Sequence, residues 1–326
     1  MTPKITVLMP VYNGEKYLKE AIESILSQTF ADFEFFIIND GSTDNSVDII
    51  KSYSDKRIIF IENEQNIGLP ATLNKGIDLA RSKYIARMDQ DDISLSERLE
   101  KQFYFMEKNH DIDICGSWIK FFGEQNFVAK YAKTHREIMS NSFSSSPMAH
   151  PTVFFRKKSF DKYNLRYNST LKFSEDYELW IRALKYLKFA NLQEVLLNYR
   201  ISPNQMTKST EKMENANKII WKTQLENLGV ELNDEELNMH QLLMCEKYQM
   251  VSPEACTNWF DKIIVANREK QFYDTKILMN IFRHKWYVAY KTTTKFNIGL
   301  FFSTKYKYLS LKNKLRFLLR LVRNKQ

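Results

Sequence analysis

The sequence predicts an α/β protein in which a mostly parallel sheet is flanked by helices and followed by a mainly helical C-terminal region. Short apolar runs alternate with amphipathic stretches through the first 110 residues at a spacing of about 25 residues, which is typical of βαβ units. Apolar residues make up 44% of the 326 residues and aromatic residues 14%. This composition can bury a core and excludes a disordered chain.

Four apolar runs in this first part predict the buried strands of the sheet. They are Ile5–Pro10, Phe33–Asn39, Ile58–Glu62 and Tyr84–Asp89. Apolar residues at helical spacing predict helices over Glu15–Gln28, Asp44–Tyr53 and Pro70–Ala80, and a fourth helix through Leu99, Phe103 and Met106. Ligands of such sheets bind beyond the carboxyl ends of the strands, so we expect the functional site at that edge.

The remaining chain changes character twice. Further strands are predicted over Ile112–Phe122, His150–Phe155 and Asn191–Arg200, with an amphipathic helix over Glu175–Leu187. From Thr210 onwards the pattern is helical, and the stretch Ser202–Ser209 before it resembles a linker. We therefore expect a first domain over residues 1–205, with halves of about 1–110 and 111–205, and a helical region over 206–326.

Charge is distributed unevenly along the chain. The 48 Lys and Arg residues exceed the 39 Asp and Glu residues by nine, but residues 275–326 contain 13 of the basic residues and no acidic one. The rest of the chain is slightly acidic, which excludes a uniformly basic nucleic-acid-binding protein. No secretory signal or membrane-spanning stretch is recognisable, so we expect a cytoplasmic location.

Polar clusters follow three of the predicted strands, and a fourth cluster opens a helix. They are Pro10-Val11-Tyr12-Asn13-Gly14, Asn39-Asp40-Gly41-Ser42-Thr43-Asp44, Asp89-Gln90-Asp91-Asp92 and Ser174-Glu175-Asp176. Any one of them alone is explained by an ordinary turn or helix start. All four on one edge of one sheet indicate a binding site rich in carboxylates.

These four stretches, together with Asn66-Ile67-Gly68-Leu69 and the Trp180 and Arg182 that follow Asp176, resemble the family-2 glycosyltransferases over about residues 3–200. The resemblance implies a GT-A fold, which has a Rossmann-like sheet. It also implies transfer of a hexosyl or N-acetylhexosaminyl group, with inversion, from a UDP- or dTDP-sugar to an acceptor hydroxyl. Mn²⁺ or Mg²⁺ is the implied cofactor, because negative charge develops on the leaving diphosphate.

The resemblance also assigns donor-binding roles. Asp91 matches the metal ligand, Asp89 a position facing the ribose hydroxyls, and Asp40 the carboxylate that accepts the N3–H of uracil or thymine. Pro10 and Tyr12 would frame the base, although Tyr12 also fits a lid on the sheet edge.

Three further residues near the donor have two interpretations each. Gly68 would let the backbone approach the nucleotide, or serve the turn before the helix that contains Pro70. Arg87 would contact the diphosphate or pair with an acid such as Asp89. Asp92 has no firm role, and capping or support of its neighbours is an alternative.

On the acceptor side, Asp176 is the predicted general base, with Glu175 orienting the acceptor or contacting it. Acids at a helix start are also common for stability alone. His150 would contact acceptor or phosphate, or be purely structural. Trp180 is expected in the core, and Arg182 would brace Glu175 or Asp176.

The basic tail, residues 275–326, suggests where in the cell the protein binds. Its apolar residues Leu311, Leu315, Leu318, Leu319 and Val322 fall on one helical face, and Lys312, Arg316, Arg320 and Arg323 on an adjoining one. Such a helix suits an anionic membrane surface, although a helix packed on its own domain or on a partner protein is an alternative.

Together these features predict a peripheral enzyme on the inner face of the cell membrane that adds a sugar to a glycan or lipid-linked glycan. Assembly of a bacterial capsule, O-antigen or related polysaccharide would fit. A catalytically silent subunit that binds a glycan or a partner protein is the main alternative. A sugar nucleotidyltransferase is less consistent, because PVYNG at residues 10–14 is not a Gly-rich phosphate loop bearing Arg or Lys.

Overall fold

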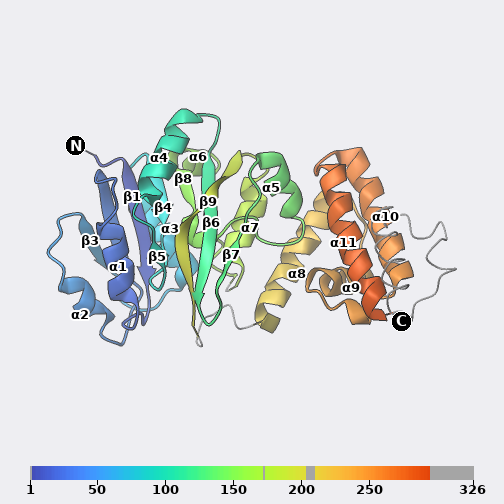
Figure 1. Ribbon diagram of the computed structural model, residues 1–326, viewed down its shortest axis with the longest axis horizontal. Coiled ribbons are helices and arrows are strands. Elements are labelled where there is room, and N and C mark those ends of the chain that lie inside the picture. Colours follow the sequence, from blue (N-terminus) through green and yellow to red (C-terminus); the bar gives the residue numbers. More distant parts are fainter. Residues whose placement is uncertain (1, 172, 203–209, 294–326) are drawn as a thin grey trace, which may run out of the picture. The chain divides into compact units, whose positions relative to one another are not determined.

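The apolar runs of the first 110 residues form the parallel half of a sheet in the computed structural model, which describes residues 2–171, 173–202 and 210–293 (Figure 1). In spatial order, these strands are β3 (Ile58–Glu62), β2 (Phe33–Asn39), β1 (Ile5–Val11) and β4 (Tyr84–Arg87). Val7 of β1 lies opposite Phe35 of β2 and Ala86 of β4. The predicted order of strands and helices in this part is confirmed.

The second half of the sheet is mixed. Its strands continue as β8 (Phe154–Arg156), β6 (Ile114–Gly123), β9 (Phe189–Ile201) and β5 (Ile93–Ser94), with β7 (Phe127–Ala129) paired to β6. β8 runs antiparallel to β4 and to β6, whereas β6 and β9 are parallel. The predicted strand over His150–Phe155 is wrong in its first half, which is the 3₁₀ turn η1 (His150–Thr152). Pro151 has no backbone N–H to donate to a sheet, which favours the turn.

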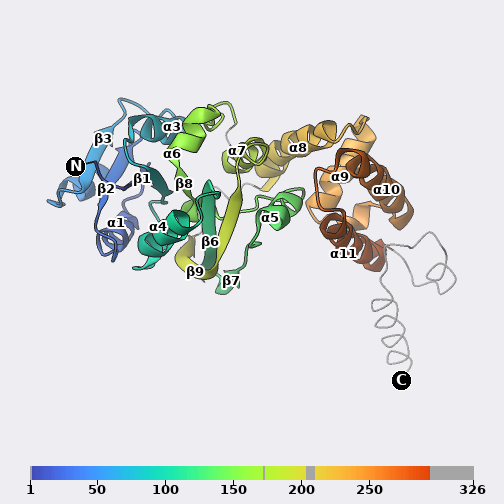
Figure 2. The same ribbon diagram turned by 90° about the horizontal axis from the view of Figure 1, so that it is seen from above.

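Helices cover both faces of the sheet (Figure 2). α1 (Leu18–Leu26) and α4 (Arg98–Lys108) lie on one face, where Ile22 and Leu99 share a buried cluster with Val7 and Met9 of β1. α3 (Leu69–Leu79) and α6 (Lys157–Lys162) lie on the other face. A Cβ on Gly76 of α3 would stand 2.2 Å from Leu8 Cδ1, so glycine permits this close approach of helix and sheet.

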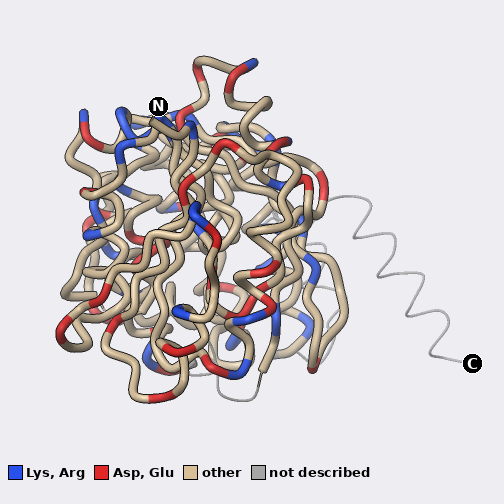
Figure 3. Tube along the Cα trace, turned by 90° about the vertical axis from the view of Figure 1, so that its left-hand side faces the viewer, with Lys and Arg blue, Asp and Glu red and all other residues tan. Residues whose placement is uncertain are grey.

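Three further α-helices complete the first 200 residues: α2 (Ser46–Lys51), α5 (His135–Asn141) and α7 (Glu175–Ala183). α7 ends at Ala183, four residues earlier than the helix predicted over Glu175–Leu187. Basic and acidic residues are interspersed along the described chain (Figure 3). The predicted α/β class, with a sheet flanked by helices and a helical C-terminal part, is confirmed.

The chain divides into two compact units. The described residues of the first unit lie within 2–138 and 146–216, and those of the second lie within 139–145 and 217–293. Helices α8 (Thr210–Asn227), α9 (Asp234–Met244), α10 (Pro253–Lys270) and α11 (Thr275–Thr293) follow the sheet, with the short η3 (Tyr248–Met250) between α9 and α10. In the second unit, the ring of Phe143 packs edge-on against His240, Tyr273 and Phe282.

Two predicted features fall outside this description. Most of the predicted linker (203–209) and the end of the basic tail (294–326), which contains the predicted amphipathic helix, lie outside the described residues. Among the helices that are described, none combines the length and the apolar character that a membrane span requires.

Candidate functional site

Three carboxyl groups gather in the turn that follows β4. Each of Asp89, Asp91 and Asp92 offers a carboxylate oxygen, and these oxygens lie within 4.8 Å of one another. Asp92 is only 1% exposed; its Oδ1 accepts a hydrogen bond of 2.9 Å from the backbone N–H of Arg200. Its Oδ2 has no hydrogen-bond partner among the described residues. Burial, and then the charges of Asp89 and Asp91, raise the pKa of Asp92 well above its ordinary value.

This turn fits a divalent cation. Like charges at such short range repel one another, and a buried carboxylate oxygen without a partner is costly. Mg²⁺ and Mn²⁺ prefer oxygen ligands such as carboxylates and would offset both costs. The two oxygens of Asp92 therefore differ. Oδ1 is held by the backbone of Arg200, whereas Oδ2 has no partner within the described residues and could bind a cation together with Asp89 and Asp91.

Arg87, the last residue of β4, is the buried cation beside these acids. Its side chain is 4% exposed and forms an ion pair with Asp89 through Nη1. Of the two interpretations of Arg87, pairing with Asp89 is the one that the structure shows. Its Nε has no hydrogen-bond partner within the described part of the chain.

The loop after β1 is tied to the acidic turn through Gln90. The side-chain oxygen of Gln90 accepts from the backbone N–H of Tyr12 at 2.8 Å, and its amide nitrogen donates to the carbonyl of Tyr12 at 3.0 Å. Pro10 lies buried in β1, whereas Tyr12 is 46% exposed. A Cβ on Gly14 would stand 2.6 Å from Gln90 Oε1, so glycine is needed for this contact.

Asp40 organises the loop that leads into α3. Its Oδ1 accepts hydrogen bonds from Asn63 Nδ2 at 2.8 Å and from the backbone N–H of Ile67 at 2.9 Å. Its Oδ2 accepts from the N–H of Gly68 at 2.9 Å. Gly68 has a φ of +87° at the start of α3, so it serves the turn that begins this helix, and its approach to the nucleotide stays a prediction. The structure therefore brings Asp40 and Gly68 into direct contact.

Of the two acids at the start of α7, Glu175 is buried and Asp176 is half-buried. Glu175 is 7% exposed, and burial, followed by the nearby charge of Asp176, raises the pKa of Glu175 to about 7. Asp176 Oδ2 accepts a hydrogen bond of 3.1 Å from Ser146 Oγ. Burial raises the pKa of Asp176, although this hydrogen bond and Arg87 oppose the shift. At this position a proton is held more tightly than on a carboxyl in water.

Tyr167 marks the point where the β4 turn and α7 converge. Burial raises the pKa of its phenol; Arg87 lowers it, and Asp176, Glu175 and Asp89 raise it further. All of these charges therefore act on one buried hydroxyl group. His150 shares a hydrogen bond of 2.8 Å with that hydroxyl, and burial and Arg87 lower the pKa of His150 well below its ordinary value. His150 is consequently neutral at pH 7.

Two expectations for α7 have different outcomes. Trp180 is fully buried and lies edge-on against Phe189, which confirms the predicted core position. The prediction that Arg182 braces Glu175 or Asp176 is wrong. Arg182 forms an ion pair of 2.6 Å with Glu178 and donates to the carbonyl of Arg166. Glu178 lies one helical turn before Arg182, which is the favoured spacing for such a pair.

Sequence reasoning missed Gln90, Ser146, Tyr167 and Arg200. Gln90 and Arg200 could have been identified from the sequence, because both stand at the ends of predicted strands, on the edge of the sheet where the acids gather. Ser146 and Tyr167 lie in irregular segments and carry no local signal. Their roles depend on contacts with residues 30 and 17 positions away in the sequence.

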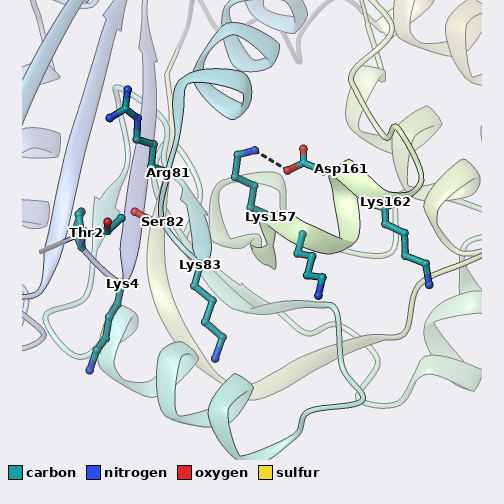
Figure 4. A pocket seen from close by; sticks show the side chains of 10 residues that line it. Thr2, Lys4, Arg81, Ser82, Lys83, Lys157, Asp161 and Lys162 are labelled. Atoms are coloured by element: carbon teal, nitrogen blue, oxygen red, sulfur yellow. Dashed lines mark hydrogen bonds and ion pairs between the residues drawn. The ribbon is translucent and has the colours of Figure 1, made fainter.

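An open hollow of about 720 Å³ lies at the opposite edge of the sheet, before β1 and β4 (Figure 4). Its basic lining residues are Lys4, Arg81, Lys83, Lys157, Lys158 and Lys162. Lys157 forms an ion pair of 2.6 Å with Asp161, and Lys83 one of 2.5 Å with Glu107. None of the predicted site residues lines this hollow.

Comparisons with known proteins agree with this geometry. Residues 6–164 match the sequence profile of Glycosyl transferase family 2. An uncharacterised glycosyltransferase of Methanocaldococcus jannaschii is 45% identical over 212 residues, which cover 62% of this chain and 72% of that protein. A UDP-Gal:alpha-D-GlcNAc-diphosphoundecaprenol beta-1,3-galactosyltransferase of Escherichia coli is 34% identical over 62% of this chain and 75% of its own length.

The fold has solved counterparts as well. The crystal structure of S. aureus TarS residues 1–349 in complex with UDP-GlcNAc superposes with a TM-score of 0.61 at 19% identity, over 88% of this chain and 89% of that one. At this identity the likeness concerns the fold alone, which is the GT-A fold expected from the motifs. The sequence relatives and the matched profile establish more: the chain belongs to glycosyl transferase family 2.

Proposed function

We propose that this protein is a metal-dependent, inverting glycosyltransferase that moves a hexosyl or N-acetylhexosaminyl group from a UDP- or dTDP-sugar to an acceptor hydroxyl. One observation carries the proposal. The acidic turn Asp89–Asp92 and the pair Glu175–Asp176 both interact electrostatically with the same buried groups, Arg87 and Tyr167. A site for a diphosphate with its cation and a site for a general base thus adjoin, as sugar transfer requires.

Asp40, Tyr12, Pro10 and Gly68 would bind the nucleoside of the donor. A carboxylate offers about four acceptor sites, and three of those on Asp40 are occupied by Asn63, Ile67 and Gly68. The remaining site on Oδ2 suits a base that donates its N3–H, as uracil and thymine do. The exposed ring of Tyr12 is available to stack on that base.

Asp91 would bind the divalent cation, with Asp92 beside it and Asp89 facing the ribose. When bound, Mn²⁺ or Mg²⁺ supplies positive charge that stabilises the leaving diphosphate. Arg87 holds Asp89 in place through their ion pair, and Gln90 fixes the turn to the loop at Tyr12.

Asp176 would take the proton of the acceptor hydroxyl as that oxygen attacks the anomeric carbon from the side opposite the diphosphate. The bond to the diphosphate breaks as the new glycosidic bond forms, so the configuration inverts. The hydrogen bond from Ser146 orients the carboxylate of Asp176. Its raised pKa makes it a stronger base than a carboxylate in water. Glu175 would contact or orient the acceptor, and neutral His150 would hydrogen-bond it.

The acceptor would be a growing glycan, carried on a lipid at the cytoplasmic membrane face during assembly of a bacterial surface polysaccharide. The name of the E. coli relative, which includes a diphosphoundecaprenol acceptor, supports this setting. The basic tail over residues 305–326 would bind the anionic membrane. Deletion of that tail should release the protein from anionic vesicles while UDP binding persists. Unchanged vesicle binding would refute this part of the proposal.

A thermal-shift screen of UDP-, dTDP-, GDP- and CDP-sugars with Mn²⁺, Mg²⁺ or EDTA tests the proposal, because ligands of the native state raise its melting temperature. We expect the largest shift with a uracil or thymine nucleotide and a metal. Hits are then tested for turnover. If no nucleotide-sugar is bound or turned over, the protein is the non-catalytic glycan- or partner-binding subunit.

A further inference from the structure

Arg200, near the end of β9, is packed beside the acidic turn. Its side chain is 12% exposed. The guanidinium lies over the ring of Tyr17 at 4.2 Å and over that of Phe122 at 4.5 Å. Planar guanidinium groups stack on aromatic rings while their N–H groups remain free to donate in the plane. The two rings therefore fix the plane in which Arg200 can form hydrogen bonds.

Arg200 holds the turn at two points, one through its side chain and one through its backbone. Its Nε donates to the backbone carbonyl of Asp91 at 2.8 Å, and its backbone N–H donates to Asp92 Oδ1 at 2.9 Å. On its other side, Nη2 forms an ion pair of 2.8 Å with Glu20 of α1. One residue thus links β9 and α1 to the peptide group of Asp91 and to the carboxylate of Asp92.

The geometry of this link bears on cation binding. Mutual repulsion drives the carboxylates of Asp89, Asp91 and Asp92 apart, and a flexible turn would let them separate when no cation is present. The side chain of Arg200 holds the Asp91 peptide, and its backbone N–H holds one oxygen of Asp92, while Asp92 Oδ2 has no partner within the described residues. The ligand oxygens are therefore kept close together before a cation arrives, which reduces the free-energy cost of binding.

We propose that Arg200 is a positioning residue that sets the affinity of the acidic turn for its divalent cation. The inference rests on the proposed function, since it needs the turn to bind metal. Arg200 would act through Asp91 and Asp92. Its removal should weaken metal binding strongly, whereas the turnover rate at saturating metal and donor should change little.

A purely structural role for Arg200 is the competing explanation, and Arg57 offers a matched control. The guanidinium of Arg57 lies 4.7 Å from the ring centroid of Phe33. It donates to the carbonyl of Leu26 at 2.9 Å and forms an ion pair of 2.7 Å with Asp55. These are the same kinds of contact that Arg200 makes. They lie just before β3, at the edge of the sheet remote from the acidic turn.

The experiment titrates Mn²⁺ into the full-length protein and measures free Mn²⁺ by electron paramagnetic resonance for the wild type, Arg200→Gln, Arg200→Lys and Arg57→Gln. Arg200→Gln should weaken Mn²⁺ binding about tenfold or more, the order expected for loss of charge-assisted hydrogen bonds. Arg200→Lys should be intermediate, because lysine keeps the charge but neither stacks nor donates in the same plane. Arg57→Gln should bind Mn²⁺ as the wild type does, even if its melting temperature in EDTA falls equally.

Two results would overturn the inference while the proposed function stands. One is a folded Arg200→Gln protein whose Mn²⁺ affinity is within twofold of the wild type. The other is an equal loss of affinity in Arg57→Gln, which would assign the effect to general destabilisation. If Arg200→Gln does not fold, wild-type affinity in Arg200→Lys refutes the inference in the same way. A wild-type protein that binds neither Mn²⁺ nor UDP would refute the proposed function itself, and this inference with it.

Discussion

The two edges of the sheet carry opposite charge in different environments. At the carboxyl ends of the strands, Asp92 is 1% and Glu175 is 7% exposed, and both have pKa values raised by burial. At the amino ends, Lys158 and Lys162 line the basic hollow from the solvent-exposed surface. Lys83 and Lys157 in the same hollow each form an ion pair with an acid.

This contrast shows why the acidic edge is assigned the function. Burial of a carboxylate without a full set of partners costs free energy, and such groups are expected where a ligand compensates that cost. Exposed lysines cost little and are screened by salt, so a basic surface alone indicates no particular ligand. The hollow is concave, but the buried carboxyl groups with raised pKa values lie at the other edge.

The largest effect should come from Asp91→Asn. Loss of this carboxylate removes a predicted ligand of the divalent cation, so the charge of the leaving diphosphate is no longer offset. Transfer activity should fall to the level seen in EDTA, and added Mn²⁺ should not restore it. Initial rates over a series of Mn²⁺ concentrations provide the measurement. Wild-type rates in Asp91→Asn would remove the metal assignment from this residue.

Asp176→Asn should reduce turnover by roughly 10²- to 10⁴-fold, which is the usual contribution of a general base. The amide can still accept a hydrogen bond from Ser146 but cannot take the acceptor's proton. Donor binding should remain, because Asp40 and the acidic turn are unchanged. UDP affinity and turnover are to be measured on the same preparation. A loss of UDP binding with no separate loss of turnover would place the base elsewhere.

Glu175→Gln should stabilise the metal-free protein at pH 8. The pKa of Glu175 is raised from 4.5 to about 7, so the folded state binds this proton more tightly than the unfolded state does. The stability associated with that proton is present at low pH and is lost as the pH rises through about 7. Glutamine removes the charged form, so the gain at pH 8 should reach up to about 3 kcal/mol.

Urea denaturation in EDTA at pH 5 and pH 8 measures this effect. The difference between Glu175→Gln and the wild type should be larger at pH 8. Asp176 and Asp92 also have raised pKa values, so part of the pH dependence should persist in the variant. An equal difference at both pH values would mean that Glu175 is ionised in the folded protein throughout.

The smallest effect should come from the basic edge. The double substitution Lys158→Ala and Lys162→Ala removes two exposed charges that line the hollow. Neither residue contacts the acidic turn or α7 in any hydrogen bond or ion pair of the described structure. We expect kcat/KM and the melting temperature to match the wild type within error. A marked rise in the KM for the donor would assign the hollow a part in donor binding.

The sequence was most informative where patterns are long and local. The apolar runs Ile5–Pro10 and Phe33–Asn39 became β1 and β2, because continuous apolar stretches of this length must be buried. The three-residue strand β7 and the short helix α6 were not predicted, and β8 was predicted only in part. Elements of three to six residues contain fewer than two periods of the strand or helix pattern of apolar residues, which is too few to recognise.

In the candidate site, too, residues within local sequence patterns were predicted, and residues defined by long-range contacts were missed. Asp40, Asp91 and Asp176 were identified because they stand at strand and helix ends within recognisable stretches. Arg200 binds Asp92 and Asp91, which lie 108 and 109 positions earlier in the sequence. Tyr167 likewise interacts with Asp89, which is distant in the sequence. No local pattern encodes such contacts. The prediction for Arg182 was wrong because Arg182 pairs with Glu178, four residues earlier on the same helix, and not with Glu175 or Asp176.

The most direct test of the account is a calorimetric titration of UDP, with and without Mn²⁺, against three proteins: the wild type, Asp91→Asn and the double variant Lys158→Ala/Lys162→Ala. We predict that Mn²⁺ strengthens UDP binding in the wild type and in the lysine variant, and that Asp91→Asn loses this strengthening. Metal-strengthened binding that persists in Asp91→Asn but disappears in the lysine variant would contradict the account, since it would place the nucleotide at the basic edge.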